Sequence, residues 1–574
     1  MGKRFIIYCI LLVLGMGGSS YAQERVFVST DKNSYIVGED IWISLYCTTG
    51  DTKEYSQESS VAYLEFHSAQ GVEHTLKLAL IEGRGCGRLQ IPFNFATGNY
   101  SIVAYTRKNG GKSKDKFNGK TISVFNTITD EKVKGGTRVV KKPEYENKGI
   151  QTQASESPVR FKIDVKGGSE TGGNIDINVR SLYMSGTHAN FNISLYHLDE
   201  IEKYAERQGI GQVPLTARTG TLSPTGITEY AGEIIRVKVT PSEEANMNMN
   251  GKFLYMSAKG NEDDLYVGAL DSLGYVTYYT NNMSGDKELL FEVVDDVTMT
   301  SRTSSKAGSI SRYNVNIVED NHIHTPDSIP VLQIFPQLKD ALEERNIRMQ
   351  ISRRFEADSL FNLMEMRSAS YLGGATHTIY NLDDYTRFPT MEDVVREYVT
   401  HLRIRKMNGV TSLRVVNDDV KEFVWVAKSP ALALLDGVPV RDHEILVNLN
   451  PLLVKQIIVY PRQFILNHFV FDGVVKFNTY KGDMGGIKIE DMYEIIPHKG
   501  VQYPLAFLTD GIMDNVRYPN YNSTLYWNPI VKLDNGETFR FTVARPKYSG
   551  EFKIRIEGID GEGKSIFHEE TITL

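Results

Sequence analysis

Alternation of apolar and polar residues with a period of two recurs along most of the chain and is the feature that most restricts its fold. In residues 552–557, aromatic or aliphatic side chains at Phe552, Ile554 and Ile556 alternate with charged ones. This pattern gives a strand one face for a core and one for water. Residues 539–543, 175–179 and 191–195 show the same alternation. We expect each run to form an antiparallel strand.

Turn-forming residues separate these runs. Clusters rich in Gly and Asn stand at KNGGK (108–112), at KGGSETGG near Gly167 and at LDNGE around Asn535. Short strands with frequent turns predict β-sandwiches in series. The chain has 574 residues, 41% of them hydrophobic, which predicts roughly three to five domains at ~100–200 residues each. We therefore expect a mainly β protein of several domains.

Helical signal is confined to two places. Residues 337–366 are rich in helix formers and contain no Pro or Gly, and Thr390 to Asp393 has the T-x-x-D form of a capping box. By contrast, residues 131–158 are polar and lysine-rich without a core pattern, which indicates a linker.

The first residues have the layout of a secretory signal peptide. Lys3 and Arg4 precede an apolar run to Met16, and small or polar residues lead to Ala22. Cleavage after Ala22 is expected, and Cys9 lies within the apolar run, which argues against a lipid-modified cysteine. No later stretch reaches the ~20 apolar residues of a membrane span, so we expect an exported chain without a transmembrane helix after cleavage.

The sequence provides no defensible catalytic, cofactor or metal site. The motifs G-x-S-x-G, H-E-x-x-H and G-x-G-x-x-G do not occur. His322 and His324 have the spacing of one strand face, which suits a metal pair or a solvated loop. Acidic clusters such as residues 261–264 fit either a calcium site or a loop that faces solvent. The net charge of −7 argues against nucleic acid as a partner.

Two separated motifs stand near the N-terminus, a D-x-x-x-Y-x-x-G-E start and a later P-x-x-x-x-x-G-x-Y. The residues in them are Asp31, Tyr35, Gly38, Glu39, Pro92, Gly98 and Tyr100. This pair of motifs resembles the second-type domain of the alpha-2-macroglobulin family. The resemblance covers about one hundred residues and implies a β-sandwich. Gly38 and Gly98 suit turns with unusual φ.

The stretch GCGRLQ raises the question of a thioester, the Cys–Gln cross-link by which macroglobulins trap targets. In that family the motif is Gly-Cys-Gly-Glu-Gln, with the reacting residues three apart. Here Gln90 is four residues from Cys86, and the Glu is missing. We therefore expect no thioester. A disulfide between Cys47 and Cys86 is the alternative use of these cysteines in an oxidising compartment, provided that the two Cα atoms meet at ~5.5 Å.

Three motifs follow one another in the last third of the chain, with the patterns D-G-x-P, N-P-x-x-I-x-x-I-x-V and G-x-I-x-I-x-T. The matching residues are Asp436, Gly437 and Pro439, then Asn450, Pro451, Val454, Ile457 and Val459, then Gly473, Val475, Phe477 and Thr479. In order and spacing they resemble the plug of TonB-dependent receptors. The usual YG before the third motif is replaced by Phe471-Asp472.

The barrel that normally surrounds such a plug is not expected here. A barrel of 22 strands at ~10 residues each needs more than ~200 residues, whereas 94 residues follow Tyr480. The hydrophobic TonB box also has no counterpart. We therefore expect a plug-like domain without transport activity of its own.

The C-terminal segment resembles the final immunoglobulin-like module of exported macroglobulin-related envelope proteins. The matching residues are Tyr526, Trp527 and Pro529 at its entry and Gly550, Phe552, Ile554, Ile556, Glu557 and Gly558 at its exit. Residues 230–239 begin a stretch similar to a carboxypeptidase-regulatory-like β-domain.

Together these features predict tandem immunoglobulin- and macroglobulin-like β-sandwiches with a small α/β plug-like domain near the C-terminus. The expected segments are a signal peptide (1–22), a macroglobulin-type sandwich (23–130), a linker (131–158), a β-domain (159–229), a carboxypeptidase-regulatory-like sandwich (230–322), a helical connector (323–389), the plug-like domain (390–485) and an immunoglobulin-like domain (486–574).

The function expected from this organisation is binding or scaffolding without catalysis or cofactor. The chain would lie in the periplasm or at the outer membrane of a Gram-negative cell, with an envelope protein as partner and an outer-membrane barrel among the candidates. The alternative is a macroglobulin-like protein that interacts with proteases without a thioester. An enzyme with an unrecognised active site is the third reading.

Overall fold

The chain divides into two compact units that are each assembled from distant segments. Unit 1 comprises Met1–Tyr230, His322–Glu365 and Gln502–Leu574, and unit 2 comprises Ala231–Asn321 and Met366–Val501. The computed structural model describes residues 24–50, 54–109, 116–117, 119–141, 159–167, 173–184, 188–210, 226–242, 249–259, 264–281, 283–295, 313–318, 325–326, 328–355, 361–363, 372, 374–407, 409–417, 425–467, 469–488, 492–507, 519–560 and 564–574. The protein is mainly β, as expected. The expected signal peptide lies outside the described residues. Within the described part, no helix is long and apolar enough to cross a membrane.

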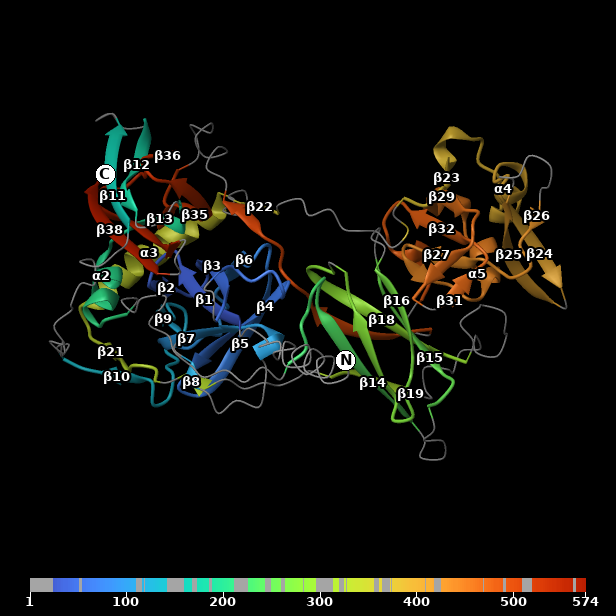
Figure 1. The fold of residues 1–574 in the computed structure, drawn as a ribbon, viewed down its shortest axis with the longest axis horizontal. Helices are drawn as coiled ribbons and strands as arrows, with labels where there is room; N and C mark the ends of the chain where they lie inside the picture. Colours follow the sequence, from blue (N-terminus) through green and yellow to red (C-terminus); the bar gives the residue numbers. More distant parts are fainter. Residues whose placement is uncertain are drawn as a thin grey trace, which may run out of the picture. The chain divides into compact units, whose positions relative to one another are not determined.

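Unit 1 begins with a sandwich of two sheets (Figure 1). One sheet has the order β1-β3-β6 and the other β2-β9-β7-β4-β5. The strands are β1 (Glu24–Thr30), β2 (Ser34–Ile36), β3 (Asp40–Thr49), β4 (Val61–Ser68), β5 (Gly71–Ala79), β6 (Arg84–Gln90), β7 (Gly98–Tyr105) and β9 (Lys120–Phe125). Their apolar faces meet in a core that includes Tyr35, Ile43 and Tyr100.

The second sandwich of unit 1 joins two parts of the chain that are more than 300 residues apart. Its sheets have the orders β11-β12-β36 and β35-β13-β37-β38. The strands are β11 (Val159–Gly167), β12 (Asn174–Met184), β13 (His188–His197), β35 (Thr524–Asp534), β36 (Thr538–Ala544), β37 (Glu551–Asp560) and β38 (Ser565–Thr573). The expected domains 159–229 and 486–574 therefore share one sandwich. The prediction of two separate domains is wrong because strands far apart in the sequence pair in the same sheets.

The two sandwiches of unit 1 also pack on each other. Phe27 and Tyr46 of the first contact Ile559 of the second, and Trp42 packs on Trp527 with ring centroids 5.2 Å apart. The four sheets thus form a stack. The contact between the two sandwiches buries the face of β37 that the alternation predicts to face water. On this face Lys553, Arg555 and Glu557 are at most 7% exposed. That part of the sequence expectation is wrong.

The buried charges of β37 are compensated by neighbours. Arg555 donates to Asn33 in the first sandwich (3.0 Å) and to Glu569 on β38 (2.7 Å). Glu557 accepts a hydrogen bond from the Ser29 hydroxyl. Buried charges are tolerated only with such partners, so this face specifies the joint between the sandwiches.

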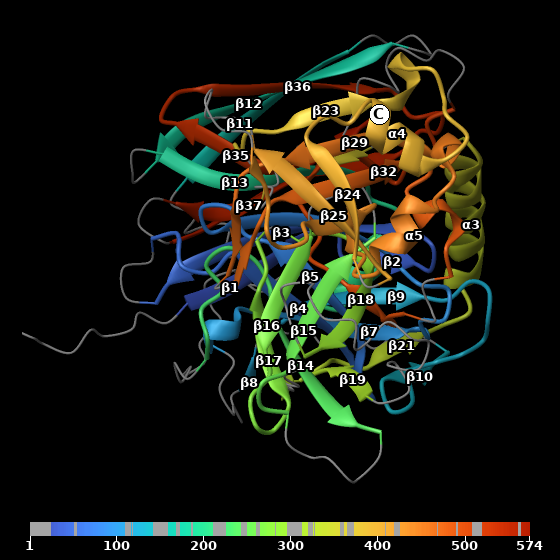
Figure 2. The same cartoon turned by 90° about the vertical axis from the view of Figure 1, so that its right-hand side faces the viewer.

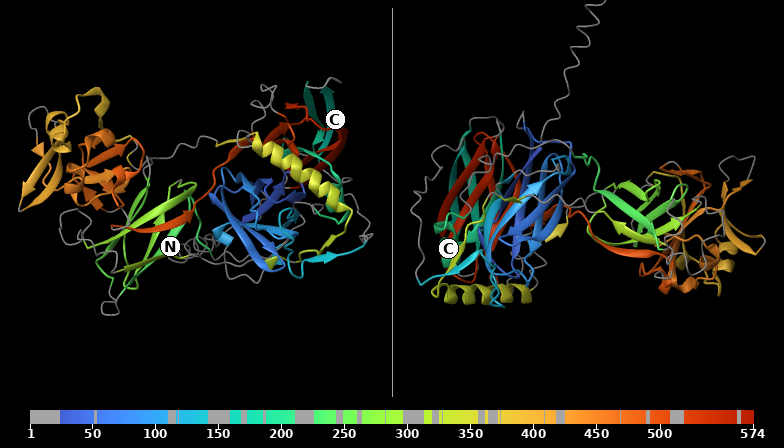
Figure 3. Two further views of the ribbon diagram at one scale, coloured as in Figure 1. Left: turned by 180° about the vertical axis from the view of Figure 1, so that it is seen from behind. Right: turned by 90° about the horizontal axis from the view of Figure 1, so that it is seen from below.

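Two segments outside the sandwiches complete unit 1. The first part of the expected linker is ordered: Val133 lies in the core of the first sandwich, and β10 (Thr137–Val139) pairs with β21 (Leu332–Ile334). Helix α3 (Leu338–Arg354) runs along the line where the blue N-terminal and red C-terminal strands meet (Figure 3). It ends before the expected residue 366, because β22 (Phe361–Leu363) pairs with β34 (Leu505–Phe507) and pairing overrides helix propensity.

Unit 2 contains a sandwich and a plug-like part. The sandwich has the sheets β17-β14-β19 and β16-β15-β18-β33. Its strands are β14 (Ile234–Pro241), β15 (Phe253–Ala258), β16 (Leu265–Ala269), β17 (Tyr275–Tyr279), β18 (Asp286–Val294), β19 (Tyr313–Ile317) and β33 (Glu494–Lys499). Strand β33 comes from beyond the expected plug domain, so residues 230–322 do not complete this sandwich alone.

The plug-like part is built on a five-stranded sheet of order β23-β29-β32-β27-β28, visible beside the β24–β25 hairpin in Figure 2. Its elements are β23 (Thr378–Asn381), α4 (Met391–Glu397), β24 (Leu402–Met407), β25 (Val410–Asn417), β27 (Leu432–Leu435), β28 (Val438–Pro439), α5 (His443–Val447), β29 (Val454–Tyr460) and β32 (Val474–Thr479). The Thr390 hydroxyl accepts from the Asp393 N–H, which confirms the expected cap of α4. Strand β23 precedes residue 390, so the sheet begins within the expected connector.

The first and third plug motifs meet at Asp436. Asp436 and Gly437 have φ of 48° and 86° and connect β27 to β28, as a two-residue type I′ turn requires. The fully buried Asp436 carboxylate accepts from the Thr479 N–H (2.7 Å) and hydroxyl (2.6 Å) and from the Met484 N–H (2.8 Å). The Asp-Gly pair forms the tight turn that such a pair favours, and its aspartate links the two motifs.

Cys47 and Cys86 are buried free thiols. Cys47 lies in the core of the first sandwich, whereas Cys86 lies among Trp42, Leu505 and Trp527 between the two sandwiches. Ser44, three residues before Cys47, is the residue that pairs with Cys86. Side chains alternate between faces, so the cysteines point to opposite sides of one sheet, and the disulfide alternative is not realised.

Candidate functional site

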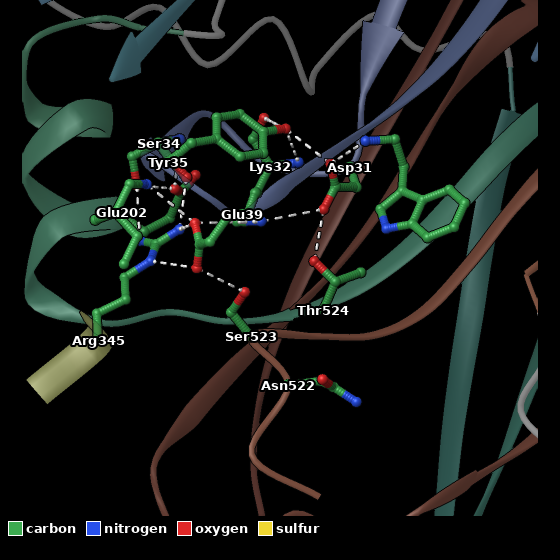
Figure 4. A network of polar contacts seen from close by, with 12 residues as sticks. Asp31, Lys32, Ser34, Tyr35, Glu39, Glu202, Arg345, Asn522, Ser523 and Thr524 are labelled. Carbon is green, nitrogen blue, oxygen red and sulfur yellow. Dashed lines mark hydrogen bonds and ion pairs between the residues drawn. The ribbon is translucent and has the colours of Figure 1, made fainter. Parts of the chain in front are cut away.

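The acidic segment DKNSYIVGED, residues 31–40, forms the centre of a buried polar network in unit 1 (Figure 4). Asp31 is fully buried and accepts hydrogen bonds from the Tyr35 hydroxyl (2.8 Å), the Trp42 N–H (3.0 Å) and the Thr524 hydroxyl (2.5 Å). Lys32 lies 3.4 Å from Asp31 and 4.2 Å above the Tyr35 ring. The macroglobulin-like motif thus places its Asp and Tyr in direct contact.

Arg345 of α3 reaches into this network and is only 2% exposed. Its Nε and Nη2 donate to the two carboxylate oxygens of Glu39 at 3.0 and 2.9 Å, and Nη1 lies 3.3 Å from Asp199. Nη2 also donates to the Ser34 carbonyl at 2.6 Å. A bidentate guanidinium–carboxylate pair is among the strong polar contacts. Arg345 therefore ties the helix to both sandwiches.

Charge controls the ionisation of the network carboxylates. Burial alone would raise the pKa of Glu39, but Arg345 and Lys32 outweigh it and hold this pKa at about 2. Asp40, next in sequence, shows the opposite balance: burial raises its pKa to about 6, against the opposing charges of Arg88 and Arg353. Glu39 is thus a fixed anion at neutral pH, whereas Asp40 titrates near pH 6.

The turn that presents Glu39 depends on a glycine. Gly38 has a φ of 88°, and a Cβ there would lie 2.9 Å from the Phe93 ring. A side chain at this position would meet both backbone strain and a clash. The Gly-Glu pair of the motif therefore positions Glu39 for Arg345.

A pocket of about 650 Å³, part of it open to solvent, adjoins the network; we call it the α3 pocket. Helix α3, residues 38–42, residues 197–199 and residues 521–524 line it. Its aromatic walls are Trp42, Phe507, Tyr521 and Tyr548. Small-molecule sites likewise combine apolar walls with a few polar groups.

Four side chains of the α3 pocket carry a buried polar atom without a hydrogen-bond partner among the described residues. These atoms are Arg348 Nε, Ser352 Oγ, Arg353 Nη2 and Asp40 Oδ1. Ser352 is 6% exposed. Buried polar groups normally have partners, so this side of the pocket suits a polar group that the described part of the chain does not supply.

His197 lies at the pocket wall and is held neutral. Burial and the neighbouring Arg348, Arg345 and Lys203 lower its pKa to about 4, although Asp199 opposes them. Its Nδ1 lies 3.1 Å from Arg348 Nη1. A neutral imidazole accepting from Arg348 orients the guanidinium, which also lies 4.6 Å above the Tyr548 ring.

The sequence indicated only part of this site. Asp31, Tyr35, Gly38 and Glu39 stand out through the macroglobulin-like motif, and Asp199 followed by Glu202 is a capping signal for α2 (Glu200–Arg207). Nothing distinguishes Arg345, Arg348, Ser352 and Arg353 from other polar residues of a helix. Their convergence depends on where α3 packs.

The other sequence candidates lie mostly outside the described residues and stay predictions. His322 and His324 lie outside the described residues, as do residues 261–263, while Asp264 pairs with Lys287. Within the described ranges no cluster of His, Cys, Asp and Glu is arranged for a metal ion. GCGRLQ forms most of β6.

Residues 558–565 also fit the spacing of a phosphate-binding loop, G-x-x-x-x-G-K-S. That loop requires a strand followed by a helix. Here Gly558 lies in β37 and Ser565 begins the antiparallel β38. The match is therefore a coincidence of composition.

No family model and no curated protein matches the chain. Among solved structures it is similar to trypsin-activated alpha-2-macroglobulin from Escherichia coli, at 9% identity and a TM-score of 0.22 over 97% of this chain and 42% of that one. It is also similar to methylamine-reacted alpha-2-macroglobulin from Salmonella, at 8% identity and a TM-score of 0.24 over 96% of this chain and 39% of that one. The chain spans about two fifths of these proteins, and at such TM-scores the likenesses carry no argument about its fold or function.

Proposed function

We propose that the chain is an exported, non-enzymatic binding protein of the cell envelope and that the α3 pocket is its binding site. The observation that carries this proposal is the set of four partnerless polar atoms in a pocket with aromatic walls. Arg345 joins the elements around it, so the walls are held in place before a ligand arrives. Such preorganisation favours binding because less order is lost when the ligand enters.

The ionisation of the pocket favours binding over catalysis. A general base works best with a pKa near the operating pH, whereas the pKa of Glu39 is about 2 and that of His197 about 4. The Ser523 and Thr524 hydroxyls donate to Glu39 and Asp31. Asp40 has a more suitable pKa of about 6, but no described hydroxyl or thiol donates to its free oxygen.

The envelope location is proposed from the signal-like N-terminus and the plug-like motifs. The mature protein would begin after Ala22 and associate with the outer membrane through a protein partner of the plug-like part. Fractionation of a Gram-negative host with mass spectrometry of the N-terminus tests this. A chain that retains residues 1–22 in the cytoplasm would contradict it.

Photo-crosslinking in intact cells tests the binding site itself. We would place p-benzoylphenylalanine at Tyr521 in the pocket wall and, as a matched control, at Tyr230, which is 74% exposed and outside the pocket. We expect a discrete adduct at Tyr521 alone. Equal labelling at both positions, or no adduct at Tyr521, would contradict the proposal.

A further inference from the structure

The unpartnered donors of the α3 pocket belong to the last turns of one helix: Arg348 and Ser352 share a face of α3, and Arg353 lies about 100° further round. Arg348 and Ser352 are four residues apart on α3, which places them on neighbouring turns, and Arg353 follows directly. Each carries a buried atom that can donate a hydrogen bond: Nε, Oγ and Nη2 respectively. Arg345, one turn earlier, is in contrast fully engaged by Glu39, Asp199 and Ser34.

The charges around these turns are unequally compensated. Arg345 is balanced by two buried carboxylates, whereas among the described residues the one ion pair of Arg348 is with Glu344, whose side chain is 69% exposed. For Arg353 the described part of the chain shows no ion pair, and its guanidinium lies 5.5 Å from the Phe93 ring centre. An exposed ion pair contributes little. Two arginines therefore remain available to an anion.

Asp40 narrows the choice of anion. Its free Oδ1 accepts rather than donates at neutral pH, and its negative charge opposes a dianion such as phosphate more than a monoanion. A ligand with a carboxylate and a nearby N–H would satisfy both the arginines and Asp40. The guanidinium fork matches a planar carboxylate.

The walls indicate what is attached to the carboxylate. Trp42, Phe507, Tyr521 and Tyr548 offer aromatic surface, and the Tyr521 and Tyr548 rings stack with centroids 6.2 Å apart. Apolar or aromatic groups gain most from such surface. Because the pocket is partly open to solvent, the rest of a larger ligand such as a peptide can extend out of it.

We propose that the α3 pocket binds an α-carboxylate next to an apolar or aromatic side chain, with Arg348, Arg353 and Ser352 holding the carboxylate and Asp40 accepting from the adjacent nitrogen. This inference rests on the proposed binding role of the pocket. A free amino acid and the C-terminus of a peptide share this chemistry. Titration with a peptide and with the free amino acid distinguishes these two ligands.

Calorimetric titration of the full mature chain tests the inference, with tryptophan fluorescence as a second readout because Trp42 lines the pocket. The probes are acetyl-Ala-Ala-Phe with a free carboxylate, the same peptide as its C-terminal amide, free phenylalanine and inorganic phosphate. We expect the acid peptide to bind at least ~10-fold more tightly than the amide, equivalent to about 1.4 kcal/mol. Stronger binding of free phenylalanine than of the peptide would identify the amino acid as the source.

Variants on α3 assign the contacts. Arg348→Met and Arg353→Met should each weaken the acid peptide at least ~10-fold, and Ser352→Ala should weaken it by a few fold. Arg354→Met, an exposed arginine on the same helix, is the matched control and should leave affinity unchanged. Because Arg348 and Arg353 lie outside the Glu39 network, these variants should keep the wild-type melting temperature within a few degrees.

Three results would overturn the inference: equal binding of acid and amide peptides, unchanged affinity in all three variants, or competition by phosphate alone. Failure of every probe to bind at millimolar concentration would also overturn it. If these tests fail while Tyr521 still crosslinks in cells, the proposed function stands and only the ligand class is wrong.

Discussion

Replacing Arg345 by methionine should destabilise unit 1 strongly. Methionine keeps the length of the side chain but removes the guanidinium that pairs with the buried carboxylates of Glu39 and Asp199, which are 8% and 9% exposed, and leaves Glu39 with Lys32 at 3.8 Å. Breaking a buried ion pair in this way typically costs 3–5 kcal/mol. The pKa of Glu39 is consistent with this size: Arg345 and Lys32 together lower it from 4.5 to about 2 against the effect of burial, a net shift of about 3 kcal/mol. We therefore expect a loss of about 3–5 kcal/mol at pH 7.

The pH dependence gives the same prediction a second form. Because the pKa of Glu39 is lower in the folded protein, the ionised Glu39 adds to the free energy of unfolding above pH ~4.5, and this stabilisation is lost as the pH falls toward about 2. In Arg345→Met, burial dominates and Glu39 takes up a proton at higher pH. The variant should therefore lack the wild-type loss of stability between pH 4.5 and 2.

Urea unfolding and calorimetry of the full chain measure this effect on the transition of unit 1. Arg354→Met is the matched control, since that exposed residue is on the same helix, and it should change stability by less than about 0.5 kcal/mol. Adding Glu39→Gln to Arg345→Met should recover part of the loss. A cost below about 1 kcal/mol, or strictly additive single and double variants, would refute the reasoning.

Four further predictions concern other parts of the molecule. Ile457→Asp should abolish the calorimetric transition of unit 2 by placing a charge in a core position with 0% exposure, whereas the exposed neighbour variant Lys455→Asp should melt normally. Asp436→Ala should cost about 3 kcal/mol in urea unfolding, because three donors at Thr479 and Met484 lose their acceptor, and a cost near zero would show that the turn alone matters. Folding raises the pKa of Asp40 from 3.8 to about 6, so the stability that the protonated carboxyl contributes is lost as the pH rises through 6. Asp40→Asn, which stays neutral, should therefore be more stable than wild type at pH 8 by about 2–3 kcal/mol. Cys47 and Cys86 should resist Ellman's reagent in the native protein and both react in denaturant, and a disulfide in the exported protein would contradict the opposite-face geometry.

Local features were predictable because nearby residues decide them. Thr390 caps α4 through a contact three residues away, and Asp436-Gly437 forms a turn that its own backbone preferences favour. The apolar residues of β12 and β36 point inward as alternation requires. In each case the relevant free energy comes from a few adjacent residues.

The polar face of β37 shows where such reasoning ends. Alternation identifies which side chains share a face, but not what covers that face. Arg555 is 1% exposed because Asn33 and Glu569 lie beside it, and Asn33 is more than 500 residues away in sequence. A charged face that is covered by complementary partners has the same sequence pattern as one in water.

The sequence by itself determined that the chain is mainly β, where many of its strands and turns begin and that an Asp-Tyr-Gly-Glu motif opens the first sandwich. The tertiary structure alone decided that residues 159–197 and 524–573 share one sandwich, that the cysteines face apart and that α3 places Arg345, Arg348 and Ser352 beside that motif. The physical reason is the distance along the sequence over which the deciding interactions act. Strand periodicity and turns are local preferences, whereas sheet partners and buried charge pairs depend on which distant segments minimise the free energy of the whole unit.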